Sequence, residues 1–357
     1  MQNFFDFTRE ELKVLLKENF NAPSFVGDQL FDWVYKKGQK DFDLMTNVSK
    51  QYRESLKSFF TFKYAEVIKR EISNDGTRKY LLKVPSGKEI ETVLINQVNR
   101  KTLCVSSQYG CGMACSFCRT GTMGFLANLE TADIIAQVMA INEDAKEFND
   151  SFSNMVFMGM GEPLHNYKGV TRALKILTDP LAFEIGPRRI TVSTVGLVPA
   201  IKKFAKEELG VNLAVSLNAT TDEVRSQIMP VNKNFPIKVL LDTLREFPLT
   251  GKRRITIEYV MLAGINDTMD DIKRLVRILD GIKCKINLIP YNDNAGLGFK
   301  TPSRNHVFRC LNMLTASNMD ATVRWSKGND IKAACGQLVT SVNNENKERS
   351  KLVQIIQ

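Results

Sequence analysis

Apolar and polar positions repeat with two different periods along the chain. From about residue 100 onward, short apolar runs of strand length are followed by longer stretches with apolar residues at helical spacing. The predicted strands are 102–106, 154–158, 189–194, 211–217, 254–262 and 285–289, with a last one near 321–325. The predicted helices lie near 131–146, 167–178, 197–208, 236–247, 269–280 and 303–317. Strands that alternate with helices favour a parallel sheet, so these units predict an α/β fold with a partial, open (β/α)6 barrel over residues 97–340.

The first 60 residues predict a small helical N-terminal domain. Thr8 and Glu11 fit a capping box at the start of one helix, and Gly38 is placed to end another. Residues 1–60 are therefore a candidate accessory domain. Its lysines suit docking onto RNA, although simple packing explains the same pattern equally well: Lys36, Lys37 and Lys40.

Residues 61–96 predict a meander of three strands that links this domain to the barrel. Asn74-Asp75-Gly76 marks the first turn and Pro85-Ser86-Gly87-Lys88 the second. In the third strand, the two-residue period places Glu91 on the same face as its apolar neighbours. A carboxylate there is either paired with a cation or has a raised pKa that makes it a usable base. The residues alone favour the paired, structural alternative.

The composition is that of an ordinary soluble globular protein, with 43% hydrophobic and 25% charged residues among 357. No stretch has the length of a membrane span, and the first residues lack the features of a signal peptide. The net charge of +10 permits a polyanionic partner, and we expect a basic tail at 341–357. These features predict a cytoplasmic protein without membrane association, and nothing in them demands more than a monomer.

Three cysteines stand close together at the spacing C-x3-C-x2-C: Cys111, Cys115 and Cys118. Structural zinc sites usually present cysteines in C-x2-C pairs and collect four ligands, whereas this run offers three. Three thiolates on a four-iron cluster would leave one iron open to bind and activate a small molecule. The alternatives are a structural metal site that lacks one ligand, or buried thiols. A cluster also implies a reducing compartment.

Glycines and polar residues gather at the carboxyl ends of the predicted strands, where parallel barrels concentrate function. The cysteine run follows the first strand. Gly159-Met160-Gly161-Glu162-Pro163 follows the second, where glycines let a ligand approach the backbone and Glu162 can bind an ammonium group. The third, fourth and sixth strands end in Ser193-Thr194, Ser216-Leu217-Asn218 and Pro290-Tyr291-Asn292. Each could be a simple turn, but together they predict one ligand site.

The cysteine spacing, with Phe117 before the last cysteine, resembles the radical S-adenosylmethionine (SAM) superfamily. Three longer segments resemble one family within it, the dual-specificity 23S ribosomal RNA and transfer RNA adenine-C2 methyltransferases, together with their C8-methylating relatives. These segments are Cys104-Val105-Ser106-Ser107-Gln108, Phe157-Met158-Gly159-Met160-Gly161-Glu162-Pro163-Leu164 and Asp330-Ile331-Lys332-Ala333-Ala334-Cys335-Gly336-Gln337-Leu338. The resemblance covers nearly the whole chain.

The resemblance implies a role for each candidate site residue. It implies that a [4Fe–4S] cluster is held by Cys111, Cys115 and Cys118, and that SAM is bound by Gly161, Glu162, Ser193, Ser216, Leu217, Asn218 and Asn292. It further implies that Cys335 carries the methyl group, that Cys104 releases the product and that Glu91 is the proton acceptor, which outweighs the structural alternative for Glu91. Many members have His at the position of Asn218, and both side chains can hydrogen-bond a ribose or a carboxylate.

The implied chemistry uses two SAM molecules per turnover, because C2 of adenine is too electron-poor to attack the methyl group of SAM. One SAM methylates Cys335, and a second, split reductively at the cluster, removes a hydrogen from that methyl group. The carbon adds to adenine, a base removes the C2 proton, and Cys104 attacks Cys335 to free the product and form a disulfide. The implied partners are 23S rRNA, tRNA and an electron donor such as flavodoxin or ferredoxin.

Two alternative functions stay open at this point. The first is methylation of C8 of adenine, and Pro163 favours C2 because it resembles the housekeeping members. The second is a non-enzymatic RNA-binding protein with a structural metal cluster, against which the polar strand ends argue. Cys284 and Cys310 lack comparable context and are expected in the core.

Overall fold

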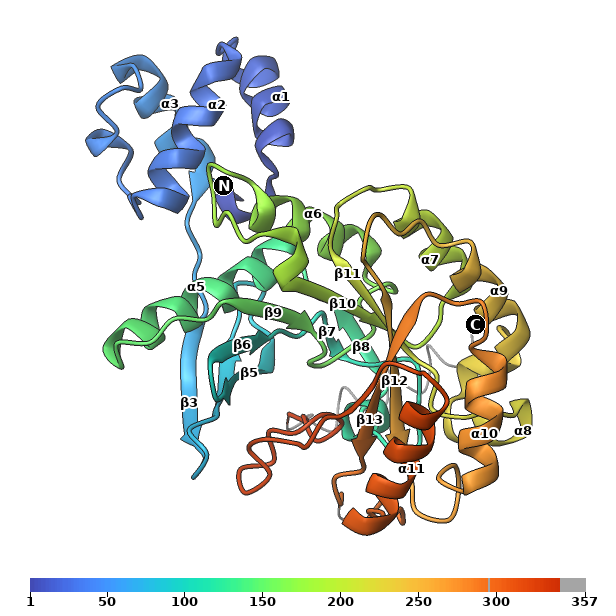
Figure 1. Ribbon diagram of the computed structural model, residues 1–357. Helices are drawn as coiled ribbons and strands as arrows, with labels where there is room; N and C mark the ends of the chain where they lie inside the picture. The colour runs from blue at the N-terminus through green and yellow to red at the C-terminus, as the bar shows by residue number, and fades with distance from the viewer. Residues whose placement is uncertain (295, 341–357) are drawn as a thin grey trace.

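The computed structural model describes residues 1–294 and 296–340, so the predicted basic tail at 341–357 lies outside the described residues. Its main element is a ten-stranded sheet in the order β14-β13-β12-β11-β10-β9-β6-β5-β4-β3 (Figure 1). The strands are β3 (Glu66–Ile72), β4 (Arg78–Lys83), β5 (Glu89–Gln97), β6 (Arg100–Cys104), β9 (Asn154–Phe157), β10 (Ile190–Thr194), β11 (Asn212–Ser216), β12 (Ile255–Met261), β13 (Cys284–Pro290) and β14 (Ala321–Val323).

The barrel part of this sheet runs from β6 through β9 to β14, with every neighbouring pair parallel. Helices connect the strands and lie on the outside of the curved sheet (Figure 1). They are α5 (Thr131–Glu147), α6 (Tyr167–Thr178), α7 (Val198–Ala205), α8 (Asp222–Ile228), α9 (Ile237–Arg245), α10 (Met269–Ile278) and α11 (Arg304–Ala316). Every predicted strand and helix is present, and the open α/β barrel is confirmed; among the helices that connect its strands, α8 was not anticipated.

The predicted meander is also present, as the antiparallel strands β3, β4 and β5. Gly76 and Gly87 occupy the two turns with φ of 80° and 81°, a conformation that favours glycine. Strand β5 pairs with β6 from Val93↔Cys104 to Gln97↔Arg100. The meander therefore continues the barrel sheet without a break.

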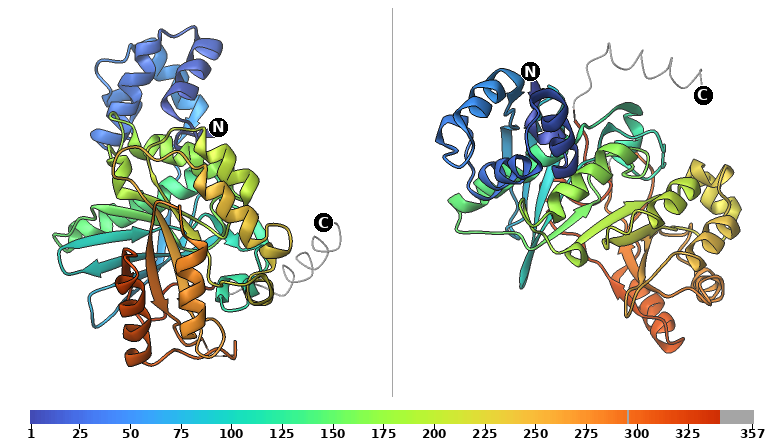
Figure 2. Two further views of the ribbon diagram at one scale, coloured as in Figure 1. Left: turned by 45° about the vertical axis from the view of Figure 1, so that its right-hand side comes forward. Right: turned by 90° about the horizontal axis from the view of Figure 1, so that it is seen from above.

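The N-terminal helices gather at one end of the molecule (Figures 1 and 2). They are α1 (Arg9–Phe20), α2 (Ser24–Phe31) and α3 (Lys50–Phe59). The predicted capping box is confirmed: Thr8 accepts from the Glu11 N–H while the Glu11 carboxylate accepts from the Thr8 N–H. Gly38, at φ 65°, follows the end of the helical stretch that begins with α2. Arg9 ties α1 to the barrel through Asp179, at 2.8 Å.

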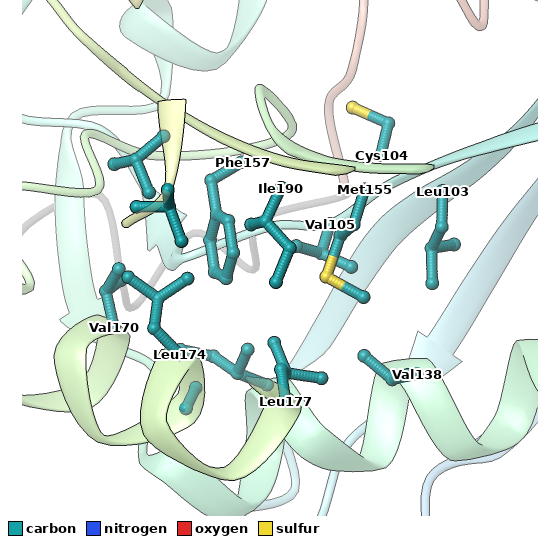
Figure 3. Packing of buried hydrophobic residues seen from close by; sticks show 14 of the residues in the cluster. Leu103, Cys104, Val105, Val138, Met155, Phe157, Val170, Leu174, Leu177 and Ile190 are labelled. Carbon is teal, nitrogen blue, oxygen red and sulfur yellow. The ribbon is translucent and has the colours of Figure 1, made fainter. Parts of the chain in front are cut away.

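Alternation along β6 divides its side chains between two environments. Figure 3 shows Leu103 pointing toward α5, whereas the sulfur of Cys104 points to the other side of the sheet. The helix-facing side belongs to a continuous apolar core with Val138, Met155 and Leu177. The opposite face of the barrel strands carries the residues described below. Within the described ranges, every helix is too short or too polar to cross a membrane.

Candidate active site

One cavity opens at the carboxyl ends of the barrel strands, and most of the predicted site residues line it. These are Cys111, Cys115, Cys118, Gly161, Glu162, Ser193, Ser216, Asn218, Asn292 and Cys335. Leu217, Cys104 and Glu91 are not among its lining residues. The structure thus brings together side chains from loops spread over more than half of the chain.

The three predicted cluster cysteines lie in a loop between β7 (Gln108–Gly110) and α4 (Arg119–Thr122). Strand β7 pairs with β8 (Phe125–Asn128), which closes a small hairpin around the loop. A Cβ at Gly121 would stand 2.9 Å from the Cys115 carbonyl oxygen, so only glycine allows this tight path. The Ser116 N–H donates to the Ile228 carbonyl, at 3.0 Å, which attaches the loop to the end of α8.

The donor set and its surroundings fit an iron–sulfur cluster. Burial raises the pKa of Cys111 to about 12 and also raises the pKa of Cys115 and Cys118. Thiols in such a pocket stay protonated unless a bound metal deprotonates them. No three Cys, His, Asp or Glu side chains in the described part of the chain are grouped to hold a single metal ion. Thiolates of a four-iron cluster bind different irons and stand further apart than the ligands of one ion.

Glu162 follows β9 in the predicted glycine turn and is only 2% exposed. Its two carboxylate oxygens accept from the backbone N–H groups of Leu164 and Val195, at 3.0 and 2.8 Å. Burial raises its pKa to about 7, and these hydrogen bonds only partly offset that effect. Among the described residues it forms no ion pair, so a cationic ligand group would find a preoriented carboxylate.

Glycine is required at position 161 because Gln108 packs against it. A Cβ at Gly161 would lie 2.4 Å from Cβ of Gln108, and its φ is 98°. The amide oxygen of Gln108 accepts from the Glu162 N–H, at 2.8 Å. The hairpin that carries the cysteines is thereby fixed to the turn that carries Glu162.

Asn218 sits in a left-handed conformation with φ 57°. Asparagine tolerates this region better than most residues. Its side-chain oxygen accepts from the Val260 N–H, at 2.8 Å, so the amide holds the ends of β11 and β12 together. Leu217 is 1% exposed and its side chain packs in the apolar core, outside the cavity lining.

Cys335 lies in an irregular segment, residues 326–340, which we call the Cys335 segment. The Arg119 N–H donates to the Gly336 carbonyl and the Thr120 hydroxyl to the Leu338 carbonyl, at 2.8 and 2.7 Å. These bonds dock the segment on the end of the cysteine loop. Cys335 therefore lines the same cavity as the three cluster cysteines.

Cys104 lies beside this cavity. It lines a smaller adjoining one, together with Cys335, Arg324 and Met158, the last three of which line both. Both thiols are free, and burial raises the pKa of Cys104 to about 12. The two cysteines to which the family resemblance gave methyl transfer and release thus face a shared space.

Glu91 is buried on the face of the sheet that also carries Cys104, since Cys104 is the cross-strand partner of Val93. Its carboxylate pairs with Lys79 at 3.2 Å and accepts from the Val339 N–H at 2.8 Å. Burial raises its pKa, and Lys79 and the Val339 N–H lower it. In this conformation Glu91 anchors the Cys335 segment to β5.

Two charged residues that line the cavity were not predicted: Glu258 on β12 and Arg324 just after β14. Glu258 is 5% exposed, and only one of its oxygens has a partner among the described residues, Asn287 at 3.0 Å. The proximity of Cys335 and Glu258 raises the pKa of Arg324. The sequence contained a signal for Glu258, because a carboxylate stands inside the apolar run of β12. The same kind of signal singled out Glu91.

Two family models match the chain. Residues 2–61 match the ribosomal RNA large subunit methyltransferase N-terminal domain, and residues 105–278 match the radical SAM superfamily. A crystal structure of a radical SAM methyltransferase from Sphaerobacter thermophilus is similar to this one with a TM-score of 0.86 and 40% identity. It covers 95% of this chain and 99% of its own.

Curated relatives extend this similarity over most of the chain. The dual-specificity RNA methyltransferase RlmN of Geobacter sulfurreducens is 49% identical over 310 residues, 87% of this chain and 84% of its own. The protein of the same name from Roseobacter denitrificans is 46% identical over 334 residues, 91% of this chain and 84% of its own. These matches set aside the alternative of a non-enzymatic RNA-binding protein. The chain belongs to the RlmN family of dual-specificity RNA methyltransferases, within the radical SAM superfamily.

Proposed function

We propose that this chain is a radical SAM enzyme that methylates C2 of adenine in 23S rRNA and in tRNA. The observation that carries the proposal is the convergence of three thiols, the Glu162 carboxylate and Cys335 on one cavity. Membership of the RlmN family supports C2 over C8 as the target position. The cytoplasm is the expected compartment for a cluster enzyme acting on these RNAs.

Cys111, Cys115 and Cys118 would hold a [4Fe–4S] cluster, which supplies the electron that cleaves SAM when both are bound. Glu162 would pair with the SAM ammonium group, because its oxygens are already fixed by two N–H donors. Hydroxyl and amide groups around the same cavity would complete the SAM site: Ser193, Ser216, Asn218 and Asn292. Leu217 would take part through its backbone.

Two of the thiols outside the cluster loop, Cys335 and Cys104, would divide the transfer between them. Cys335 would carry the methyl group, and Cys104 would attack the Cys335 sulfur to release the methylated base, leaving a disulfide between them. Their shared small cavity supports this pairing. Glu91 would accept the C2 proton; since its oxygens bind Lys79 and the Val339 N–H here, that role requires the Cys335 segment to move first.

RNA would be held by surfaces outside the cavity. We assign residues 1–60 to RNA docking, which is supported by their match to the ribosomal RNA methyltransferase N-terminal domain. The target adenine must leave its stack to reach the cavity, as it does for other base-modifying enzymes. An electron donor of the flavodoxin or ferredoxin type would reduce the cluster, and the protein would act as a monomer.

Two measurements test the proposal. Anaerobically purified protein should be brown, contain iron and sulfide, and cleave SAM to 5′-deoxyadenosine when reduced. Mass spectrometry of RNA from cells with and without the gene should show 2-methyladenosine only when the gene is present. Gene-dependent 8-methyladenosine would indicate the C8 alternative, and a colourless protein that leaves SAM intact would contradict the proposal.

A further inference from the structure

Arg225 on α8 is the largest side chain that is completely buried, with 0% exposure. Burying a cation away from water costs free energy, and proteins usually offset that cost with a paired carboxylate. Here the described residues place no carboxylate oxygen in an ion pair with Arg225. The groups that accept hydrogen bonds from this buried guanidinium therefore indicate what it stabilises.

Neutral acceptors surround the guanidinium instead. Nε donates to the carbonyl oxygen of Leu217 at 3.0 Å, and Nη2 to those of Val195 at 2.7 Å and Ser216 at 3.2 Å. Nη1 donates to the Asn232 side chain at 3.0 Å and to the Phe235 carbonyl at 3.4 Å. One side chain therefore fixes the loops that follow β10 and β11 and the loop that follows α8.

These three loops form one wall of the candidate SAM cavity, through Val195, Ser216 and Met229. The Val195 N–H in turn binds Glu162, and the Ser116 N–H of the cysteine loop binds Ile228 at the end of α8. Arg225 thus lies behind the cavity wall and is linked through Val195 to the Glu162 carboxylate and through the end of α8 to the cysteine loop.

The charge of Arg225 also acts on the cysteine loop. Cys115 is the neighbour of Ser116, whose N–H binds the Ile228 carbonyl three residues after Arg225 on α8. Burial lowers the pKa of Arg225 to about 10, and the proximity of Cys115 and Asp222 partly offsets that effect. Arg225 consequently remains a cation at neutral pH. In a buried, weakly screened environment, a fixed positive charge favours the state of a neighbouring centre that carries one more electron.

We propose that Arg225 is a positioning residue with two effects. The hydrogen bonds of its guanidinium order the wall of the SAM cavity, and its charge makes the cluster easier to reduce. The inference rests on the proposed function in one respect, that Cys115 is a cluster ligand.

Two measurements on the same preparations separate the two effects. The midpoint potential of the cluster, from a redox titration followed by electron paramagnetic resonance, reports on the charge effect. The Kd for SAM reports on the positioning effect. Arg225→Gln should lower the midpoint potential by the equivalent of about tenfold in the reduction equilibrium, which is about 59 mV for one electron. Arg225→Lys keeps the charge but loses most of the guanidinium hydrogen bonds. Its midpoint potential should therefore match the wild type, while its Kd for SAM should rise about tenfold. Arg245→Gln, which removes a comparable arginine that donates to carbonyls on the outside of the barrel, is the matched control and should change neither quantity.

Asp222→Asn tests the charge effect without touching Arg225. Asp222 partly offsets the Arg225 charge, and asparagine can keep its acceptor for the Ile237 N–H and Asn232. The potential should therefore rise, opposite in sign to Arg225→Gln. The charge effect is overturned if Arg225→Gln has a normal iron content and an unchanged midpoint potential, and Asp222→Asn does not raise the potential. The positioning effect is overturned if Arg225→Lys has the same affinity for SAM as the wild type. A wild-type protein that binds no cluster would instead contradict the proposed function.

Discussion

The two ends of the barrel are built from the same strands but carry different kinds of polar group. At the amino ends, a surface pocket is lined by Arg188, Lys252, Arg253, Arg254 and Lys285, against the single carboxylate Asp320. At the carboxyl ends, the cavity is mostly apolar and has few polar groups, which are buried and held by backbone N–H donors, as in Glu162. The net charge of +10 therefore does not indicate where the candidate active site lies. Buried, oriented polar groups without a charged partner do indicate it.

The largest expected effect of breaking the carboxyl end is loss of the cluster. Replacing Cys111, Cys115 or Cys118 with Ala removes one thiolate from a set that has no spare, so iron content and SAM cleavage should disappear together. Iron and sulfide analysis with a reduced SAM-cleavage assay checks this. Full cluster content in any one variant would remove that residue from the ligand set. Cys284→Ala, at a buried cysteine on β13, is the control and should retain the cluster.

Cys104→Ala should stop turnover after the RNA has been attached to Cys335. Without the second thiol, nothing attacks the Cys335 sulfur, so a covalent protein–RNA species should accumulate on denaturing gels. Cys335→Ala should give no such species, because it lacks the methyl carrier. Normal turnover by Cys104→Ala would make Cys104 a core thiol and leave product release to another group.

Glu162→Gln should weaken SAM binding without removing the cluster. The amide keeps the shape of the side chain but loses the charge that would pair with the ammonium group, and a hydrogen bond to a charged group contributes about 1.5–3 kcal/mol. That range corresponds to roughly a 10- to 100-fold rise in Kd. Calorimetry on protein of equal iron content measures it, and an unchanged Kd would show that Glu162 is structural.

The same carboxylate predicts a pH dependence with a definite sign. Its pKa of about 7 lies above the ordinary value, so the buried group is mainly protonated below that pH. Since the ammonium group needs the carboxylate, SAM affinity should fall as the pH drops below 7, by up to about tenfold per unit. Glu162→Gln should abolish this dependence. Wild-type affinity that stays constant between pH 6 and 8 would contradict the assignment.

The smallest effect is expected at the amino end. Lys285→Ala and Lys252→Ala remove exposed cations that do not line the cavity, so cluster content and SAM cleavage should stay at wild-type levels. The free energy of unfolding should change by no more than about 0.5 kcal/mol, as for most surface substitutions. A loss of SAM cleavage in either variant would mean that the two ends of the barrel are coupled.

The sequence predicted the barrel well because buried parallel strands leave apolar runs and because function collects at their carboxyl ends. It did not predict α8 or the burial of Arg225, since Asp222–Ile228 has the polar composition of a solvated helix and its packing depends on carbonyls of distant loops. The partner of Glu91 was equally hidden, because Val339 lies 248 positions further along the chain. The local pattern of apolar and polar residues predicts helices, strands and where they end. Contacts between residues so far apart in the sequence depend on the folded topology.

The Cys335 segment also fixes an order of events during synthesis. Its contacts reach back 257 positions from Asp330 to Ser73 and 218 from Leu338 to Thr120, so they close only when the chain is nearly complete. The three cysteines at 111–118 leave the ribosome long before residue 335, and earlier segments can fold as they emerge. The nascent chain therefore passes through an interval in which the cysteine loop exists without its cover. During that interval the three cysteines are more accessible than in the finished chain, which partly encloses them.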